Sequence, residues 1–463
     1  MKLRIDFKRL SPLYSLDICM KRHNMPGDIR RSLYFMILGN IFGALYGTVC
    51  GTGTNTMIGL ANSLNAGDLM FGILNAIPQV TMLLQIPAAM LVNYTHKRKK
   101  YMLTFGLVSR VMWLVIGLVP FFVPQSPEGL QMWTVLALLA ISSSLSVFIN
   151  CCWFPWLGDL TDPETRGSWL STKDSIVSVV SVAGGLFVAW LLDTLPGNTK
   201  YAILFAFGGG FGIIDIISYG FCKEVYATAP VKPSVKGLFK DIISNKKLVH
   251  FMVFWAAWCF TANFAGAYLN RYTINEMGVS YMAVTVCGSI ASSLFTALCI
   301  KRWGRLISIY GVKPVLWISC AVAAVTQGFF IFATPGSPIP LLLHNVIGAT
   351  FWCGGNLACS QIQLAYPSNE NKAASIAVFS CFTALAGTFL GIMCGGIFLD
   401  SMESVVFTGF WDKYKLLTLA AITLRVIVVI VFMPGVKNET EHTVKSMLKD
   451  LKRIYIKPRL KKR

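Results

Sequence analysis

The sequence predicts an all-α membrane protein in which twelve transmembrane helices form two pseudo-symmetric six-helix bundles. The first reason is composition. Of the 463 residues, 55% are hydrophobic and 13% are charged, whereas about a quarter of the residues of a soluble domain are charged. The second reason is a series of twelve apolar segments, each about 20 residues long, which is the length of a membrane-spanning helix. The third is a polar stretch that recurs at the same place in both halves and indicates a duplicated bundle.

The apolar segments are separated by short polar stretches. They cover approximately residues 33–56, 68–93, 101–124, 131–156, 169–192, 201–222, 249–270, 282–301, 314–334, 340–365, 373–398 and 414–434. This division predicts an N-terminal tail over 1–32, a first bundle over 33–222, a linker over 223–248, a second bundle over 249–434 and a basic tail over 435–463. An even number of crossings places both ends of the chain on the same side of the membrane.

The formal net charge of +20 is distributed unevenly along the chain. Most Lys and Arg residues lie in alternate loops and in the two tails, and the other loops and their borders carry few: Lys200, Arg271, Lys413 and Lys415. This bias predicts that both termini are cytoplasmic, in a multi-pass protein of the plasma membrane. Basic residues beside anionic lipid headgroups account for the charge, so we expect the lipid bilayer as a partner and no nucleic acid.

The chemistry of enzymes and metal sites is not indicated. The 13 Cys residues form no Cys-x-x-Cys pair, and most lie within apolar segments, where they act as small buried hydrophobic residues. The five His residues do not cluster, and the sequence contains neither a Gly-x4-Gly-Lys phosphate loop nor a His-Glu-x-x-His pair. We therefore expect no enzyme activity, no cofactor and no metal.

The recurring polar stretch is Trp303 to Pro314. Within it, Gly304, Leu306, Gly311 and Lys313 have the spacing Gly-x-Leu-x4-Gly-x-Lys. A weaker copy is Ala89 to Lys100. Both resemble the cytoplasmic signature loop of the major facilitator superfamily, Gly-x-Leu-x-Asp-Arg-x-Gly-x-Lys. The stretch from Asn263 to Tyr281 is similar to uncharacterised bacterial members of this family. Ser308 and Ile309 stand where the family has Asp and Arg. The resemblance implies secondary transport of a small molecule by alternating access. The stretch in the second half of the chain lacks the two charges that the family has at positions 308 and 309.

The resemblance also implies a cytoplasmic gate at these loops and after the fourth segment. Its expected members are Asn93, Lys97, Asp159, Asp162, Arg166, Gly304, Arg305, Ser308 and Gly311. Asp159 and Asp162 would form and break ion pairs as the two bundles rock. Ordinary surface ion pairs, worth about 0–1 kcal/mol, are the alternative for these charges.

In this family the first, fourth, seventh and tenth helices line the central cavity. The candidate solute-binding residues on them are Tyr46, Ser143, Ser146, Asn150, Trp153, Trp258, Asn263, Trp352 and Asn356. The spacing of three, four or seven residues places the polar side chains on one face of each helix. Amides and aromatic rings suit a neutral polar solute such as a sugar. Alternatively, the amides join neighbouring helices, at about 0.6 kcal/mol each.

Three charges lie deep inside the apolar segments, away from their ends. Arg110 and Asp215 lie at comparable depths in the third and sixth segments, which predicts an ion pair, because an unpaired Arg there costs at least about 2.5 kcal/mol. Arg425 has no carboxylate in the segments of its own half, and we expect it to extend to the inner interface or to bind Gln327. In the first segment, glycines at positions 39, 43, 47 and 51 form a bare face for a neighbouring helix.

Together these patterns predict secondary active or facilitative transport of a small organic solute by a rocker-switch mechanism. Proton-coupled efflux of amphipathic compounds and a non-transporting receptor on the same fold are the alternatives. The coupled ion would be H+ or Na+, although the cavity-lining helices carry no carboxylate at mid-depth. We expect a monomer.

Overall fold

The computed structural model describes residues 12–125, 129–225, 244–366, 372–407, 409–436 and 443–449. The elements assigned within these ranges are all helical. Contacts between residues divide the chain into two compact units, Met1–Lys232 and Pro233–Arg463. Most of the predicted linker 223–248, residues 1–11 of the predicted N-terminal tail, most of the predicted C-terminal tail and the side chain of Asn93 lie outside the described residues. The described part of the N-terminal tail forms α1 and the first turns of α2.

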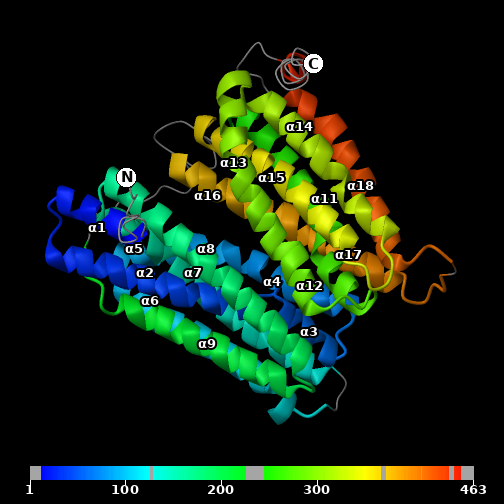
Figure 1. Ribbon diagram of the computed structural model, residues 1–463, viewed down its shortest axis with the longest axis horizontal. Coiled ribbons are helices and arrows are strands. Elements are labelled where there is room, and N and C mark those ends of the chain that lie inside the picture. Colours follow the sequence, from blue (N-terminus) through cyan, green and yellow to red (C-terminus); the bar gives the residue numbers. More distant parts are fainter. Residues whose placement is uncertain are drawn as a thin grey trace, which may run out of the picture. The chain divides into compact units, whose positions relative to one another are not determined.

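Unit 1 consists of long apolar helices joined by short turns (Figure 1). Its elements are α1 (Pro12–Arg22), α2 (Gly27–Val49), α3 (Asn55–Ser63), α4 (Asp68–Thr81), η1 (Met82–Leu84), α5 (Gln85–Thr95), α6 (Arg98–Phe122), α7 (Leu130–Leu160), α8 (Pro163–Thr194) and α9 (Thr199–Tyr219). Helix α9 packs against both α2 and α6, and α7 packs against α6 and α4. The short helix α3 lies where the sequence predicts the end of one segment and a loop.

The glycine face of α2 explains the close approach of α9. A Cβ atom at Gly39 would lie 3.0 Å from the ring of Tyr219, and one at Gly43 would lie 3.3 Å from the carboxylate of Asp215. A Cβ atom at Gly47 would have no atom of a neighbouring element within 4 Å, and Gly51 lies beyond the end of α2. Two of the four glycines therefore serve helix packing, and Gly43 makes room for a buried carboxylate.

Unit 2 has the same helical character. Its elements are α11 (Lys246–Asn275), α12 (Tyr281–Val284), η2 (Thr285–Ile290), α13 (Ala291–Tyr310), α14 (Val312–Val325), η3 (Thr326–Phe332), α15 (Ile339–Ala365), α16 (Lys372–Phe382), η5 (Thr383–Phe389), α17 (Leu390–Ser401), α18 (Lys413–Phe432) and η6 (Met433–Gly435). Helix α11 packs against η5, α17 and α18, and α15 packs against α13 and α14. Gly387 and Gly391 lie directly against the backbone of α11, where a Cβ atom would clash.

Eleven helical segments of the described chain are long and apolar enough to cross a membrane. They include every predicted segment except 340–365, which forms the 27-residue helix α15. This helix is less apolar because it carries His344, Asn345 and Asn356 along its length. These three polar residues lower the hydropathy of α15, and all three line the pocket described below.

The sequence predicts a loop at each of the two signature stretches, but in the structure both stretches are almost entirely helical. Helix α13 continues to Tyr310, and α14 begins at Val312 after the single residue Gly311. In unit 1 the break between α5 and α6 consists of two residues, His96 and Lys97, and His96 has a left-handed conformation with φ 49°. Gly311 has φ 86°, a conformation that glycine adopts without a steric penalty.

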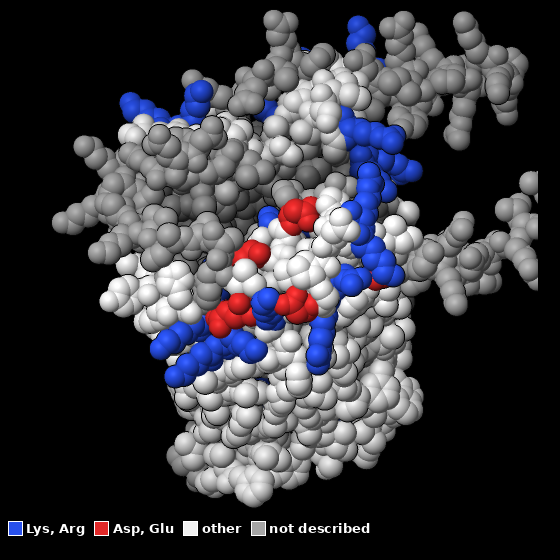
Figure 2. All heavy atoms as spheres, turned by 90° about the vertical axis from the view of Figure 1, so that its left-hand side faces the viewer, with Lys and Arg blue, Asp and Glu red and all other residues white. Residues whose placement is uncertain are grey.

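The described surface combines charged and apolar regions. Figure 2 shows groups of Lys and Arg side chains with Asp and Glu among them, and other residues over a broad part of the same face. Large hydrophobic side chains are exposed along the helices, among them Phe122 (80%), Val179 (71%) and Phe332 (72%). Exposed apolar side chains on long helices are expected where lipid is the solvent.

Candidate solute-binding pocket

Unit 2 contains a polar pocket of about 450 Å³. Five helical segments contribute to it: α11, α13, the α14–η3 segment, α15 and α18. The lining residues are Ala262, Asn263, Gly266, Ser292, Thr296, Ala323, Thr326, Gln327, His344, Asn345, Gly348, Ala349, Trp352, Cys353, Asn356 and Arg425. A volume of this size accommodates a small organic molecule.

Helix α15 contributes the largest share of the lining. His344, Gly348, Trp352 and Asn356 are four residues apart and therefore lie along one face. Beside this stripe, the Asn345 carboxamide oxygen accepts a hydrogen bond of 2.8 Å from Ser292 Oγ. The stripe presents an imidazole, an indole and a carboxamide to the same space.

The lining residue Trp352 belongs to an aromatic stack at the border of the pocket. Trp258 of α11, which is 1% exposed, stacks on Trp352 with ring centroids 5.5 Å apart and an interplanar angle of 25°. The guanidinium carbon of Arg425 lies 5.4 Å from the centroid of the Trp258 ring. An indole face near a cation contributes a cation–π attraction of about 0.5–2 kcal/mol.

Arg425 of α18 is buried, with 3% of its surface exposed, and lines the pocket. Its Nη1 donates a hydrogen bond of 3.1 Å to the carbonyl oxygen of Ala323, and its buried Nε has no acceptor among the described residues. The structure thus differs from the prediction that Arg425 extends to the interface or binds Gln327. Burial between α11 and α14 directs the guanidinium into the pocket instead of toward the end of the helix.

Two further polar groups of the pocket are incompletely bonded within the described part of the chain. The Nε2 of Gln327 donates to the carbonyl of Ala262 at 3.3 Å, while its buried Oε1 has no donor. The Nδ1 of His344 is also buried and has no partner. Such groups cost free energy unless a ligand or water satisfies them.

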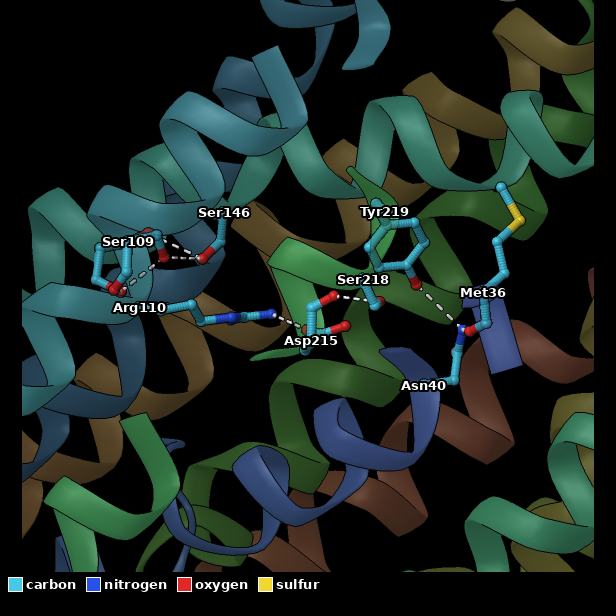
Figure 3. Close-up of polar contacts among 9 residues, drawn as sticks. Met36, Asn40, Ser109, Arg110, Ser146, Asp215, Ser218 and Tyr219 are labelled. Atoms are coloured by element: carbon cyan, nitrogen blue, oxygen red, sulfur yellow. Dashed lines mark hydrogen bonds and ion pairs between the residues drawn. The ribbon is translucent and has the colours of Figure 1, made fainter. Parts of the chain in front are cut away.

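Unit 1 contains the ion pair that the sequence predicts. Arg110 Nη2 of α6 lies 3.1 Å from Asp215 Oδ2 of α9, and both side chains are buried. Figure 3 shows the Arg110 side chain extended toward Asp215. The Tyr46 ring covers the guanidinium, with the Arg110 carbon 3.8 Å from its centroid. Tyr46, a predicted solute-binding residue, therefore packs on this pair.

The other predicted residues of unit 1 lie on α7. Ser146 Oγ is 2.7 Å from Ser109 Oγ of α6, so its hydroxyl is engaged between two helices (Figure 3). Trp153 packs against Trp169, and the Lys173 ammonium lies 5.4 Å from the Trp153 ring. Ser143 is half-buried and Asn150 is exposed. These side chains share a helix face, but none of them lines the pocket of unit 2.

Comparison with known proteins places these features in a family. The family model described as Major Facilitator Superfamily matches residues 35–392. The protein belongs to the major facilitator superfamily. Members of this superfamily are in general membrane transporters rather than enzymes, and the chain is a multi-pass membrane protein of this family. No curated protein sequence matches it.

Solved structures of superfamily transporters share the fold. A mutant of the nucleoside transporter NupG has a TM-score of 0.66 at 14% identity and covers 88% of this chain and 100% of its own. An inward-facing, occupied bacterial homologue of the human lysosomal transporter Spinster has a TM-score of 0.66 at 15% identity, covering 90% and 97%. The xylose transporter XylE from E. coli, in an inward-open conformation, has a TM-score of 0.60 at 14% identity, covering 90% and 99%.

The superfamily gate residues predicted after the fourth segment have local partners. Asp159 forms an ion pair with Arg98 at the start of α6. Asp162 caps α8, because its carboxylate accepts a hydrogen bond of 3.2 Å from the Thr165 backbone N–H. Hydrogen bonding by Thr165 holds the pKa of the Asp162 carboxyl below its usual value. His23 Nδ1 lies 3.8 Å from the same carboxylate.

Arg166 holds the turn between α7 and α8. Its Nη2 donates to the carbonyl oxygens of Gly158 at 2.8 Å and Thr161 at 2.9 Å. A cation bound to the last carbonyls of a helix also interacts favourably with the helix dipole. Arg166 is thus engaged within unit 1, whereas Lys97, at the start of α6, is exposed.

The signature stretch of unit 2 places its residues at the end of α13. Arg305 and Ser308 are exposed, and Ser308 Oγ donates to the Gly304 carbonyl at 3.1 Å. Gly311 ends the helix, with its N–H donating to Ile307 at 2.8 Å. The helix break at Gly311 is therefore present at the position of the superfamily pattern. Ser308, which stands where the family has a charge, is hydrogen-bonded to its own helix.

Sequence reasoning found part of the pocket. Of the predicted solute-binding residues, Asn263, Trp352 and Asn356 line it, and Trp258 stacks beneath. His344, Gln327 and Arg425 were not predicted as members of the pocket. The regular spacing of His344 with Trp352 and Asn356 was a usable signal, but the contributions from η3 and α18 depend on how the helices pack.

Proposed function

We propose that this protein transports a small polar solute of the sugar class by alternating access of the pocket in unit 2. Helix α15, the tenth predicted segment, then also crosses the membrane and brings the number of crossings to twelve. These form two six-helix bundles in the plasma membrane. The uneven distribution of Lys and Arg supports cytoplasmic termini for a monomeric transporter. Rocking of the two bundles about the bound solute is the corresponding mechanism.

The observation that carries the proposal is the polar stripe of α15. A membrane helix bears the cost of His344, Asn345 and Asn356 only where these side chains face other polar groups or a water-filled space. The carboxamides can bind hydroxyl groups, and the Trp352 ring can cover the apolar face of a sugar. Asn263 supports the same interpretation, because its Nδ2 donates to the backbone carbonyl oxygen of Cys259 at 2.8 Å while its carboxamide oxygen has no described partner.

The gate is proposed at the ends of α5, α7 and α13. Asn93, Lys97 and the Arg98–Asp159 pair would act in unit 1, with Asp162 and Arg166 holding the adjoining turn. Arg305 and the break at Gly311 would act in unit 2. Facilitative transport is the simplest form of the mechanism, because the described lining of the pocket contains neither Asp nor Glu to bind H+ or Na+.

Proton-coupled efflux of amphipathic compounds is the second candidate. The Trp352 ring in the lining of the pocket favours it, since an indole face can stack on an aromatic compound. Asp215 would then be the buried carboxylate available for proton coupling in unit 1. A receptor without transport activity would bind solute at the same pocket but show no flux.

Reconstituted proteoliposomes distinguish these functions. Counterflow of labelled sugars, nucleosides and organic acids is measured alongside efflux of cationic dyes under a pH gradient. We expect saturable counterflow of a polar solute, lost in Asn356→Ala but kept in Ser360→Ala, an exposed position one turn along the same helix. Dye efflux that depends on the pH gradient and survives Asn356→Ala would contradict the proposal in favour of the second candidate.

A further inference from the structure

The pocket of unit 2 contains a buried cation without a counter-ion. Arg425 has no ion pair among the described residues, and the described lining of the pocket contains no carboxylate. Its hydrogen bond to Ala323 and its contact with the Trp258 ring are both interactions with neutral groups. An ionised guanidinium removed from water is normally paired, because the cost of its desolvation is otherwise uncompensated.

We propose that Arg425 binds the carboxylate of the transported solute, so that the substrate is a small hydroxylated organic acid. The inference rests on the proposed transport function and assigns the charge of its substrate. Guanidinium and carboxylate groups match in shape and form paired charge-assisted hydrogen bonds. The pocket, at about 450 Å³, leaves room for a sugar-sized body beside that contact.

The remaining unsatisfied groups define the other end of the ligand. The free Oε1 of Gln327 is an acceptor and suits a hydroxyl group of the solute. The Asn356 carboxamide and the Trp352 ring extend the same surface along α15. The substrate therefore combines one acidic group at Arg425 with hydroxyl groups toward Gln327 and Asn356.

A carboxylate is favoured over a phosphate by the count of charges. A phosphate monoester carries about −1.5 to −2 charges at pH 7, and Arg425 is the one Lys or Arg among the described lining residues. A single guanidinium neutralises a monocarboxylate completely, whereas it would leave a phosphate with excess buried charge. The pocket is thus matched to a monoacid.

Two matched series test this inference with the purified full-length protein. The first is glucuronate, glucose and glucose 6-phosphate, and the second is glycerate, glycerol and glycerol 3-phosphate. Binding is measured as ligand-dependent thermal stabilisation, and then as counterflow in proteoliposomes. In the wild type we expect at least one carboxylate to bind about tenfold or more tightly than both its neutral and its phosphorylated twin.

Three variants assign the preference to Arg425. Arg425→Gln should remove the preference for the carboxylate, and Arg425→Lys should retain part of it, because the charge remains but the planar fork is lost. Arg302→Gln is the matched control, since it removes one exposed charge of unit 2 outside the pocket. If Arg425 were purely structural, its substitution would change the stability of the protein without changing the order in which the carboxylate, neutral and phosphorylated compounds bind.

The inference is overturned if a neutral or phosphorylated twin binds as tightly as its carboxylate, if Arg425→Gln keeps the preference, or if no carboxylate of either series binds. Failure of the transport proposal looks different. In that case carboxylates bind through Arg425 but no solute shows counterflow. Saturable counterflow of neutral sugars that is unaffected by Arg425→Gln would uphold transport and refute only the acidic substrate.

Discussion

Both units bury an arginine against an aromatic ring, but the structure gives only one of the two a carboxylate. In unit 1, Arg110 lies under Tyr46 and is 3.1 Å from Asp215. In unit 2, Arg425 lies near Trp258 and donates to a backbone carbonyl. A neutralised pair in a packed helix interface holds helices together, whereas a lone cation on a pocket wall is a site for an anion. The difference separates a structural charge from a binding charge.

The surroundings of each arginine match this division. Gly43 lies close to the Asp215 carboxylate and Ser218 Oγ donates to the Asp215 carbonyl, so the unit 1 pair lies in a closely packed helix interface. Around Arg425, Gln327 and His344 each have a buried polar atom without a described partner, and the space between them is open. The comparison can be tested with the same kinds of substitution in both units.

The largest effect is expected from Arg110→Met. The variant leaves the Asp215 carboxylate buried and unpaired, which should lower the stability of the folded protein by about 3–5 kcal/mol. Reversible unfolding in mixed micelles measures the change. The double variant Arg110→Met with Asp215→Leu should recover most of the loss, because it removes both charges. A single variant as stable as the wild type would show that the pair contributes nothing.

Gly43→Ala should have the next largest effect. Its Cβ would lie 3.3 Å from the Asp215 carboxylate, closer than ordinary contact, so we expect a loss of about 1–3 kcal/mol. Gly47→Ala is the control on the same helix face, because no atom lies within 4 Å of its Cβ. Equal effects of the two changes on the unfolding midpoint would contradict the tight packing of α2 against α9.

A smaller effect is expected at the start of α8. Asp162→Ala removes the cap of the helix and should cost about 1 kcal/mol at neutral pH. The pKa of this carboxyl is lowered by its hydrogen bonding to Thr165, so its stabilisation is present above about pH 4 and is lost as the pH falls through the lower folded pKa. Thermal midpoints of the wild type and the variant should therefore converge in acid; a constant difference down to pH 3 would refute the cap.

The smallest change in stability is expected from Arg425→Met without solute. This variant removes an uncompensated charge and keeps a side chain of similar length, so the free energy of unfolding should shift by less than about 1 kcal/mol. Measured beside Arg110→Met, it tests the comparison with one substitution in two places. A loss as large as that of Arg110→Met would mean that Arg425 is also a structural residue.

Residue patterns predicted the helices and the unit 1 pair because both depend on local spacing and depth. The positions of Arg110 and Asp215 along their segments were sufficient to pair them. Arg425 was also recognised as a membrane charge, but its surroundings come from α11, η3 and α15, and spacing within one helix cannot reveal neighbours on others. The same limit applies to Ser146, whose helix face was predicted while its partner Ser109 was not.

Ligand-dependent stabilisation in two variants tests the central claim most directly. The probe is glucuronate or glycerate, whichever stabilises the wild type more. The double variant Arg110→Met with Asp215→Leu should retain the stabilisation, because unit 1 then lacks only a structural pair. Arg425→Gln should lose it. Loss of the response in the double variant, or its survival in Arg425→Gln, would contradict the assignment of one arginine to structure and the other to the solute.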